Sequence, residues 1–531
     1  MQKVVKLQTD FGSRSAKVEM LFETLSRRIY RNPFKPLLTV FVFLGFLVYQ
    51  IPSITIDASP ESILYKNDPS LIEYNRFRDQ FGRAELIIIA IQPPEVFNTD
   101  FCNRLKSFHK ELERQVPYLL KVTSLINARH TFGNEDELIV EDLFTGWPEK
   151  PIDFVALEQQ VVTNPYYINH LISKDGRVTA VVIETEAVLR ETLSEERILS
   201  EFGENTIGGE KFSPSQRYFS EKENHEVVKA VNQVVNHYNE KSFRIKVSGG
   251  PVITDAFSRA TLKDIRLIIA LSLIAVAFFL IILFGRLSGV LLPMLIITSS
   301  LLSTLGLMSL FNVPIKLTTT VIPAFLLTVS VCDAVHILAI FYRHFKLNAD
   351  KEEAIAYAFR HSGLAIVLTS LTTNAALLSF SFADLSAIAE IGYFASAGVL
   401  LALVYTIVML PAILALIPLK STPKRNIGPS FMDTILLAVA DFTTSQSRKI
   451  IYVSFAIVAI FLPAIFNLKF SHDVMQYFPE SMPYRHDLRF IDRELGGTLT
   501  LEIILDTGRK NGIIEPQLLN HIETICRKLE K

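Results

Sequence analysis

The sequence is poor in cysteine and tryptophan and carries almost no net charge. Its 531 residues include one tryptophan and three cysteines, Cys102, Cys332 and Cys526, which lie far apart. An odd number of widely spaced cysteines indicates neither a disulfide framework nor a metal site. A formal net charge of −1 gives no indication of nucleic-acid binding. We therefore expect no metal, no other cofactor and no nucleic-acid partner.

The chain also lacks the motifs of common catalytic and energy-coupling sites. It contains no glycine-rich phosphate-binding loop of the Walker type, so ATP is not the expected energy source. No cluster of metal ligands and no nucleophile with an accompanying base stands out. The sequence therefore offers no basis for an enzyme.

What the sequence does contain is a large share of apolar residues, 49%, together with 20% charged residues. A protein that lay wholly inside a membrane would carry fewer charges. The composition therefore predicts an α-helical polytopic membrane protein that also has a sizeable domain in water.

Seven apolar runs are long enough to cross a bilayer, at about 20 residues per span. They are 36–56, 267–285, one run within 287–315, 317–342, 362–383, one run within 391–419, and 450–468. Spans two to six together make up a predicted bundle, 267–419. No small-residue cleavage site follows the first run, so we expect it to be retained.

The segment before the first span, 1–35, is basic, and its apolar residues recur at helical spacing. This pattern predicts a short amphipathic helix on the membrane surface. Because basic loops favour the cytoplasmic side, the N-terminus is predicted to be cytoplasmic and the segment 57–266 extracytoplasmic. The expected location is the plasma (inner) membrane, with several spans.

The large loop 57–266 has the character of a soluble domain. Its strand-like and helix-like runs are 84–91, 99–114, 121–126, 177–184, 224–238 and 243–247. Their order, β-α-β-β-α-β, predicts a ferredoxin-like α+β domain. An insert at about 130–176, which holds Trp147, is predicted to be irregular.

An internal repeat relates the start of the chain to its end. Residues 63–82 match 477–496 in pattern, and the match extended backwards places 450–468 on 36–56. A second copy of the first half is therefore expected to begin at residue 432.

This repeat predicts two further segments. Residues 420–449 are expected to be a cytoplasmic linker with an amphipathic helix, and 469–531 the truncated start of a second extracytoplasmic domain. Completing the second copy would extend the chain to roughly 830 residues.

The most informative residues lie in the fourth span. Asp333 stands near its centre, where an acidic side chain costs roughly 2.5–3.5 kcal/mol on insertion scales. Burial disfavours the charged form of a carboxyl group, so Asp333 is a candidate for binding and releasing a proton. His336 follows three residues later and shares a helix face with Asp333. It is either a member of a proton relay or a packed histidine bonded to a carbonyl group.

Other polar residues in the spans are candidates for supporting this relay. Asn374 and Thr373 lie in the fifth span, and Ser330 lies one helical turn before Asp333. The alternative is a structural role, in which Asp333 bonds to Asn374 or Thr373 and holds two helices together.

The layout of one span, a large outer loop, five spans and the start of the same again resembles the resistance–nodulation–division (RND) superfamily. Within it, the sequence resembles the MMPL-type exporters of hydrophobic and amphiphilic molecules, which are related to Patched-like proteins. The motifs that carry the resemblance are VSVCDAVHILAIFYRHF, LTSLTTNAALLSF, AEIGYFASAGVLLALVYTIVMLPAIL and NPYYINHLISKDGRVTAVVI. The resemblance covers nearly all of residues 17–531.

This resemblance implies proton-driven export of lipid-like molecules by a secondary active transporter, with 57–266 as a porter domain. Asp333 stands at the position of the family's proton-carrying acid in the fourth span. Many relatives place a tyrosine directly after that acid, whereas this chain has Ala334. The expected partners are membrane lipids, a hydrophobic or amphiphilic substrate and protons.

Two other functions remain open. A sensor of the sterol-sensing kind would bind a lipid within spans two to six and would not need Asp333. A translocation motor resembling the secretion-associated RND proteins is built from two six-span halves, whereas the seventh span here continues directly from the first half. The substrate, sodium in place of protons, and assembly into a homo-oligomer also remain open.

Overall fold

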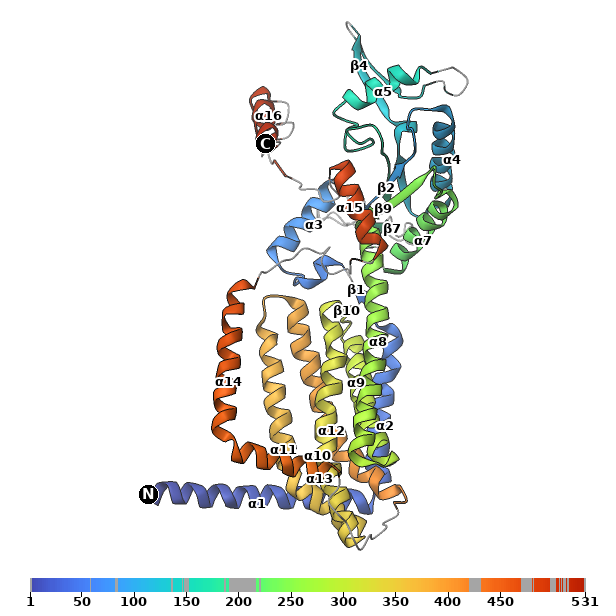
Figure 1. Ribbon diagram of the computed structural model, residues 1–531. Coiled ribbons are helices and arrows are strands. Elements are labelled where there is room, and N and C mark those ends of the chain that lie inside the picture. Colours follow the sequence, from blue (N-terminus) through green and yellow to red (C-terminus); the bar gives the residue numbers. More distant parts are fainter. Residues whose placement is uncertain are drawn as a thin grey trace, which may run out of the picture.

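The chain forms a bundle of long helices with an α+β domain at one end, and one helix, α8 (Gly250–Phe284), belongs to both parts (Figure 1). The structure is a computed structural model. It describes residues 2–57, 59–81, 85–134, 137–145, 147, 152–185, 188–190, 216–218, 221–419, 431–468, 480, 482–496, 503–505, 507, 509, 512 and 515–529.

Seven of the described helical segments are long and apolar enough to cross a membrane. They are α2 (Phe34–Gln50), α8, α9 (Leu287–Leu310), α10 (Val321–Asn348), α11 (Lys351–Leu378), α12 (Ser386–Leu416) and α14 (Ser447–Phe461). Each coincides with a predicted span, which confirms the prediction of a polytopic helical protein. Helix α14 stands at the edge of the bundle and has no buried residue (Figure 1).

Helix α8 begins directly at the end of strand β9 (Arg244–Gly249), and a glycine makes this possible. Gly249 has a φ of +128°, and a Cβ there would lie 2.1 Å from the carbonyl oxygen of Leu86. Only glycine tolerates both conditions. Pro251 follows in the first helical turn, where its missing N–H donor costs nothing. The 35-residue helix then runs about 50 Å, so the α+β domain continues into a membrane span without a hinge loop.

The αβ domain, residues 85–249, is built on a four-stranded sheet with the order β3-β6-β2-β9. Its strands are β2 (Glu85–Gln92), β3 (Leu119–Thr123), β6 (Thr179–Thr185) and β9, and all neighbours are antiparallel. Helices α4 (Thr99–Gln115) and α7 (Glu221–Tyr238) pack against this sheet through a buried cluster that includes Leu105, Phe108 and Val231.

The insert in this domain is more regular than the sequence predicts. It contains an antiparallel hairpin, β4 (Arg129–Asn134) with β5 (Glu137–Asp142), and helix α5 (Phe154–Thr163). Trp147 is buried, and its ring centroid lies 5.6 Å from that of Phe144. The expectation of an irregular insert is therefore wrong, because Phe144, Trp147 and Tyr167 join the core of the domain and the two strands of the hairpin pair with each other.

A helix from the C-terminal part of the chain also packs against the sheet. Helix α15 (Pro483–Leu495), in the segment expected to start a second domain, lies beside β9 (Figure 1). Ile491 and Leu495 share an apolar cluster with Ala90 and Ala180 of the central strands. The Nζ of Lys246 lies 2.7 Å from Oδ1 of Asp487, which links β9 to α15 by an ion pair.

The first helix, α1 (Gln2–Arg31), is longer than the short surface helix expected from the sequence. Its C-terminal half packs against α11, where a Cβ on Gly363 would lie 2.6 Å from the ring of Phe22. Arg27 pairs with Glu353 at 2.6 Å, and Arg31 pairs with Glu352 at 3.0 Å. This half of α1 is therefore attached to the bundle itself.

The remaining described elements are short or lie outside the two main parts. They are α3 (Pro69–Phe81), α13 (Phe431–Ser445), α16 (Pro516–Leu529), β1 (Ile56–Asp57), β7 (Val188–Arg190), β8 (Gln216–Tyr218) and β10 (Ile315–Lys316). Helix α13 falls within the predicted linker, while 420–430 and 469–479 lie outside the described residues.

Candidate functional site

Asp333 lies in the middle of α10 and is buried against α11. Its side chain belongs to a residue that is only 4% exposed. The hydroxyl of Ser370 in α11, itself 1% exposed, donates a hydrogen bond of 2.7 Å to Oδ2 of Asp333. Among the described residues no Lys or Arg forms an ion pair with this carboxyl group. The site is therefore a single buried acid held by a neutral hydroxyl.

The predicted partners of Asp333 in the fifth span are not its partners in the structure. The side-chain amide of Asn374 donates to the carbonyl oxygen of Ser396 at 3.0 Å and to its hydroxyl at 3.1 Å, which joins α11 to α12. Thr373 is half-buried and makes no hydrogen bond to Asp333 within the described residues. The contact expected between Asp333 and Asn374 or Thr373 is wrong, because Ser370 is the α11 residue that lies level with the acid.

Ser330 and His336 flank Asp333 on α10 in different surroundings. Ser330 is fully buried, and its hydroxyl oxygen has no hydrogen-bond partner among the described residues. His336 is exposed on the surface of the bundle. Three residues along a helix rotate a side chain by about 60°, and here that rotation separates a buried acid from an exposed imidazole. The two side chains share no hydrogen bond in the described structure.

A second polar site lies at the end of the bundle that faces the αβ domain. Lys316 is only 7% exposed, and its Nζ lies 2.6 Å from Oε1 of Glu390 and 3.3 Å from the hydroxyl of Ser386. Strand β10, which carries Lys316, pairs in parallel with β1 at the exit of α2. The Ser386 hydroxyl also lies 2.9 Å from the carbonyl oxygen of Leu64. This site links α12, α10 and the connection from α2 to the αβ domain.

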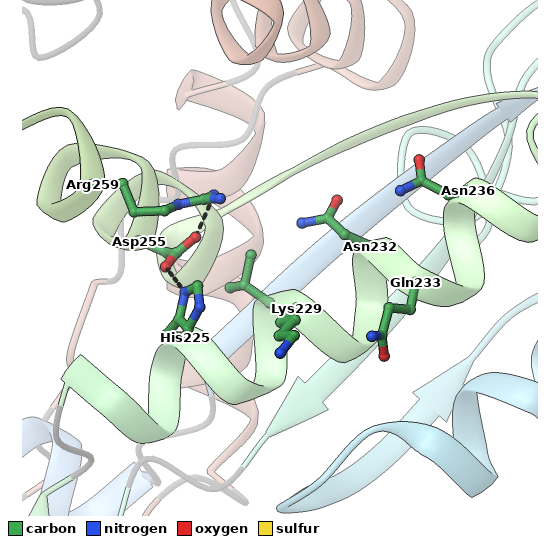
Figure 2. Close-up of a pocket in the computed structure, with 8 residues that line it drawn as sticks. His225, Lys229, Asn232, Gln233, Asn236, Asp255 and Arg259 are labelled. Atoms are coloured by element: carbon green, nitrogen blue, oxygen red, sulfur yellow. Dashed lines mark hydrogen bonds and ion pairs between the residues drawn. The ribbon is translucent and has the colours of Figure 1, made fainter. Parts of the chain in front are cut away.

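A third polar site joins α7 to the first turns of α8 (Figure 2). Asp255 is 2% exposed and lies between a histidine and an arginine side chain. Its Oδ1 lies 2.7 Å from Nδ1 of His225, and its Oδ2 lies 2.5 Å from a guanidinium nitrogen of Arg259. The same guanidinium donates to the hydroxyl of Tyr484 in α15 at 2.8 Å. Three elements distant in sequence therefore meet around one buried carboxylate.

Glu221, one turn before His225, belongs to the edge of this site. Burial raises the pKa of its carboxyl group to about 7, and the nearby carboxylates of Asp255 and Asp57 act in the same direction. Its Oε1 is buried and has no hydrogen-bond partner among the described residues. At neutral pH this side chain is close to the midpoint of its titration.

Sequence reasoning missed Ser370, the Lys316–Glu390 pair and the site around Asp255. Ser370 stands in the quoted motif LTSLTTN, so it could have been weighed with the threonines beside it. Asp255 and Arg259 are four residues apart, which is a recognisable ion-pair spacing in a helix, but no helix was predicted over these residues. Nothing in the sequence pattern pairs either residue with His225. Among the described residues, no group of three or more His, Cys, Asp or Glu side chains is arranged to hold a metal ion.

Comparisons with known proteins agree with the helical core of the structure. Residues 218–441 match the model of the MMPL family, a stretch that runs from the start of α7 through α12 to α13. The chain is also similar to a protein of Methanocaldococcus jannaschii described as a membrane protein. The two are 20% identical over 418 residues, which cover 75% of this chain and 95% of the relative. The part of the chain that contains α8–α12, with Asp333 at its centre, is therefore similar to the MMPL family, and this confirms the resemblance seen in the sequence.

Proposed function

We propose that the protein is a proton-driven exporter of hydrophobic or amphiphilic, lipid-like molecules. The match to the MMPL family supports transport of hydrophobic substrates. The single observation that supports proton coupling is the burial of Asp333 beside a neutral hydroxyl. A carboxylate buried without a cation is costly, so a bound proton relieves that cost and leaves a neutral side chain. Asp333 has this environment, since the partner seen in the described structure is the Ser370 hydroxyl.

The Ser370 hydroxyl suits both protonation states of Asp333. It donates a hydrogen bond to the ionised carboxylate, and its oxygen can accept one from the protonated acid. Binding and release of a proton therefore change the charge at the contact between α10 and α11 without leaving the acid unpartnered. Such a change of charge at a buried helix contact is the kind of event that shifts helices between two packings.

Two connections would transmit a movement of the bundle helices to the αβ domain. Helix α8 continues without interruption from β9 into the bundle, and β10 precedes α10 and pairs with β1. We further propose that the αβ domain is a ferredoxin-like porter domain. Its β-α-β-β-α-β order and antiparallel strand order β3-β6-β2-β9 support this assignment.

The proposed location is the plasma (inner) membrane, with the N-terminus in the cytoplasm and the αβ domain outside it. The basic residues at the end of α1, Arg28 and Arg31, support this orientation. The helix α1, whose last turn carries them, lies at the end of the bundle opposite the αβ domain (Figure 1).

The test is proton flux in reconstituted liposomes. Wild type, Asp333→Asn and Ser370→Ala would be inserted into liposomes with a pH gradient, and a dye would report lumenal pH while candidate amphiphiles are added. We expect substrate-dependent flux in wild type and a loss of roughly 10²-fold or more in Asp333→Asn. Ser370→Ala should reduce flux less, because water can replace the hydroxyl.

Asp384→Asn is the matched control, since it makes the same chemical change at an exposed position between α11 and α12. It should transport like wild type. Wild-type flux in Asp333→Asn would refute the proposal. If neither wild type nor Asp333→Asn moves protons but both bind lipid, a sensor role is favoured instead.

A further inference from the structure

A polar groove lies between α7 and the first turns of α8. The groove has a volume of about 330 Å³ and is lined by His225, Val228, Lys229, Asn232, Gln233, Asn236, Asp255 and Arg259. Figure 2 shows these side chains following α7 along its length, with Asp255 and Arg259 of α8 closing one end. This volume is at the lower end of the range for small-molecule sites, which suits a compact polar group.

The ionisable side chains around the groove are mainly basic. Lys229, His225 and Arg259 are basic, and the single acidic lining residue is Asp255. Lys229 is exposed and makes no ion pair or hydrogen bond with another described residue. Its ammonium group is therefore free to meet an anion that enters the groove.

Asp255 holds the other two basic side chains in place and leaves them accessible. It lies 2.7 Å from His225 and 2.5 Å from Arg259, yet the side chains of these two partners remain 46% and 47% exposed. A guanidinium has five N–H donors, and the contacts to Asp255 and Tyr484 use only part of them. These two basic side chains are thus pre-oriented, which lowers the entropic cost of binding a ligand.

The rest of the lining supplies neutral hydrogen-bond donors and acceptors. Asn232, Gln233 and Asn236 are carboxamides, and each offers two N–H donors and one carbonyl oxygen. Val228 is the one apolar lining residue. This composition suits an anionic, oxygen-rich group such as a phosphate or carboxylate and does not suit an acyl chain.

A row of cations leads from the bundle towards this groove. Arg259, Lys263 and Arg266 occupy positions i, i+4 and i+7 of α8, which place them on one helix face. All three are exposed. They follow α8 from the groove to the level at which its apolar span begins, near Leu267. An anionic group at the membrane surface would therefore find cationic partners along the whole route.

From these observations we propose that the groove between α7 and α8 binds the anionic head group of an amphiphile, while the acyl chain lies outside the groove. The inference rests on the proposed export function and adds a substrate class, namely amphiphiles with a phosphate or carboxylate head group. Charge-assisted hydrogen bonds from Lys229 and Arg259 provide the affinity, and the carboxamides of α7 orient the head group.

The experiment measures binding, with no pH gradient, by the full chain in nanodiscs of zwitterionic phosphatidylcholine. Octyl phosphate, octyltrimethylammonium and inorganic phosphate are titrated against wild type and Lys229→Glu, and empty nanodiscs are subtracted. We expect wild type to bind octyl phosphate, and Lys229→Glu to bind it roughly tenfold or more weakly. Added salt should weaken binding to wild type. Octyltrimethylammonium should not bind above the level of empty nanodiscs.

Lys241→Glu is the matched control, because Lys241 is exposed in the turn after α7 and does not line the groove. It should bind octyl phosphate within about twofold of wild type. Equal loss in both variants, or no loss in Lys229→Glu, would overturn the proposed site. Inorganic phosphate binding as tightly as octyl phosphate would assign the groove to the free anion and overturn the amphiphile.

Asp333→Asn separates this inference from the function on which it rests. This variant should bind octyl phosphate like wild type, because the groove lies in the αβ domain and Asp333 in the bundle. If proton flux fails in the liposome test while binding to the groove persists, the transport mechanism is wrong and the head-group site stands. If flux is substrate-dependent but Lys229→Glu has no effect on binding, the transport function stands and the head-group site is wrong.

Discussion

Among the residues that the structure describes, two aspartates are almost fully buried, and their partners differ. Asp255 is 2% exposed and contacts both an arginine and a histidine, whereas Asp333 is 4% exposed and contacts a serine hydroxyl. A buried carboxylate is stable in its charged form when cations and hydrogen bonds compensate it, and costly when they do not. Protonation of Asp255 would weaken its contacts with Arg259 and His225, whereas Asp333 has no ion pair to lose among the described residues. We therefore propose Asp333 as the proton-binding group.

Glu221 gives a pH-dependent prediction at the same scale. Its pKa is about 7 in the folded protein, against an ordinary value of 4.5, because burial and two nearby carboxylates disfavour its charged form. Between these two values the folded state holds a proton that the unfolded state has lost. The stability of the αβ domain should therefore fall as pH rises from 4.5 towards 7 and change little from this cause above that range.

Glu221→Gln should remove this fall, since its amide does not titrate. After allowance for the partial exposure of the carboxyl group, the difference in the free energy of unfolding between wild type and variant should change by about 1 kcal/mol between acidic and mildly alkaline pH. Thermal unfolding at pH 5 and pH 8 measures it. Glu226→Gln, on an exposed position of the same helix, is the control and should keep the wild-type pH dependence. An unchanged pH dependence in Glu221→Gln would contradict the assignment.

At the scale of elements, small residues decide how closely the spans approach. Helix α9 is among the most buried helices of the bundle, and its buried residues include Ser300, Ser303 and Gly306. The hydroxyl of Ser300 donates to the carbonyl oxygen of Gly398 in α12 at 2.8 Å. Short side chains at such contacts let backbones come together and leave few atoms for lipid to reach.

Gly306 tests this packing. A Cβ at this position would lie 2.3 Å from the carbonyl oxygen of Leu47 in α2, which cannot move away without shifting the helix. Gly306→Ala should therefore separate α2 from α9 and destabilise the bundle by about 1–3 kcal/mol. Thermal unfolding in detergent measures the loss.

Gly45→Ala is the matched control on the other partner helix. A Cβ on Gly45 meets no atom within 4 Å, and alanine favours the helical state over glycine. This variant should be as stable as wild type or slightly more stable. A Gly306→Ala protein that unfolds at the same temperature as Gly45→Ala would refute the close-packing account.

At the scale of the whole molecule, three connections join the bundle to the αβ domain. Helix α8 runs through both, β1 pairs with β10 beside the buried Lys316–Glu390 ion pair, and α15 returns from beyond α14 to the sheet. The first connects the domain to α8, and the second connects it to α10 and α12 through β10 and the ion pair. The third connects the same domain to the segment after the seventh span.

The docking of α15 can be tested with one buried residue. Ile491 is fully buried against Ala90 and Ala180 of the sheet. Ile491→Asp places an unpaired charge in this apolar contact and should release α15 at a cost of more than about 3 kcal/mol. Amide hydrogen exchange in β6 and β9 should then become faster while exchange in the bundle stays unchanged.

His486→Asp introduces the same carboxylate at an exposed position of α15 and is the control. Exchange in the sheet should remain at the wild-type rate in this variant. Fast exchange in both variants would show that any added charge loosens α15, and the apolar contact would then not explain the docking.

The sequence by itself determined the spans, the order of strands and helices in the αβ domain, and the buried acid of the fourth span. These features follow from local periodicity and from the high cost of an acid in an apolar helix, and both can be read one segment at a time. Short sequence motifs in α10, α11 and α12 likewise indicated the resemblance to MMPL proteins. The hairpin in the insert was missed because its short alternating runs are weak signals alone.

Only the tertiary structure decided which side chains meet. Whether Asp333 faces Ser370 or Asn374 depends on the rotation and vertical offset of two helices, which hydropathy does not specify. The meeting of His225, Asp255 and Arg259, and the return of α15 to a sheet formed some 300 residues earlier along the chain, depend on long-range packing. Periodicity shows which face of an element is buried, but the partner on that face is chosen by the whole fold.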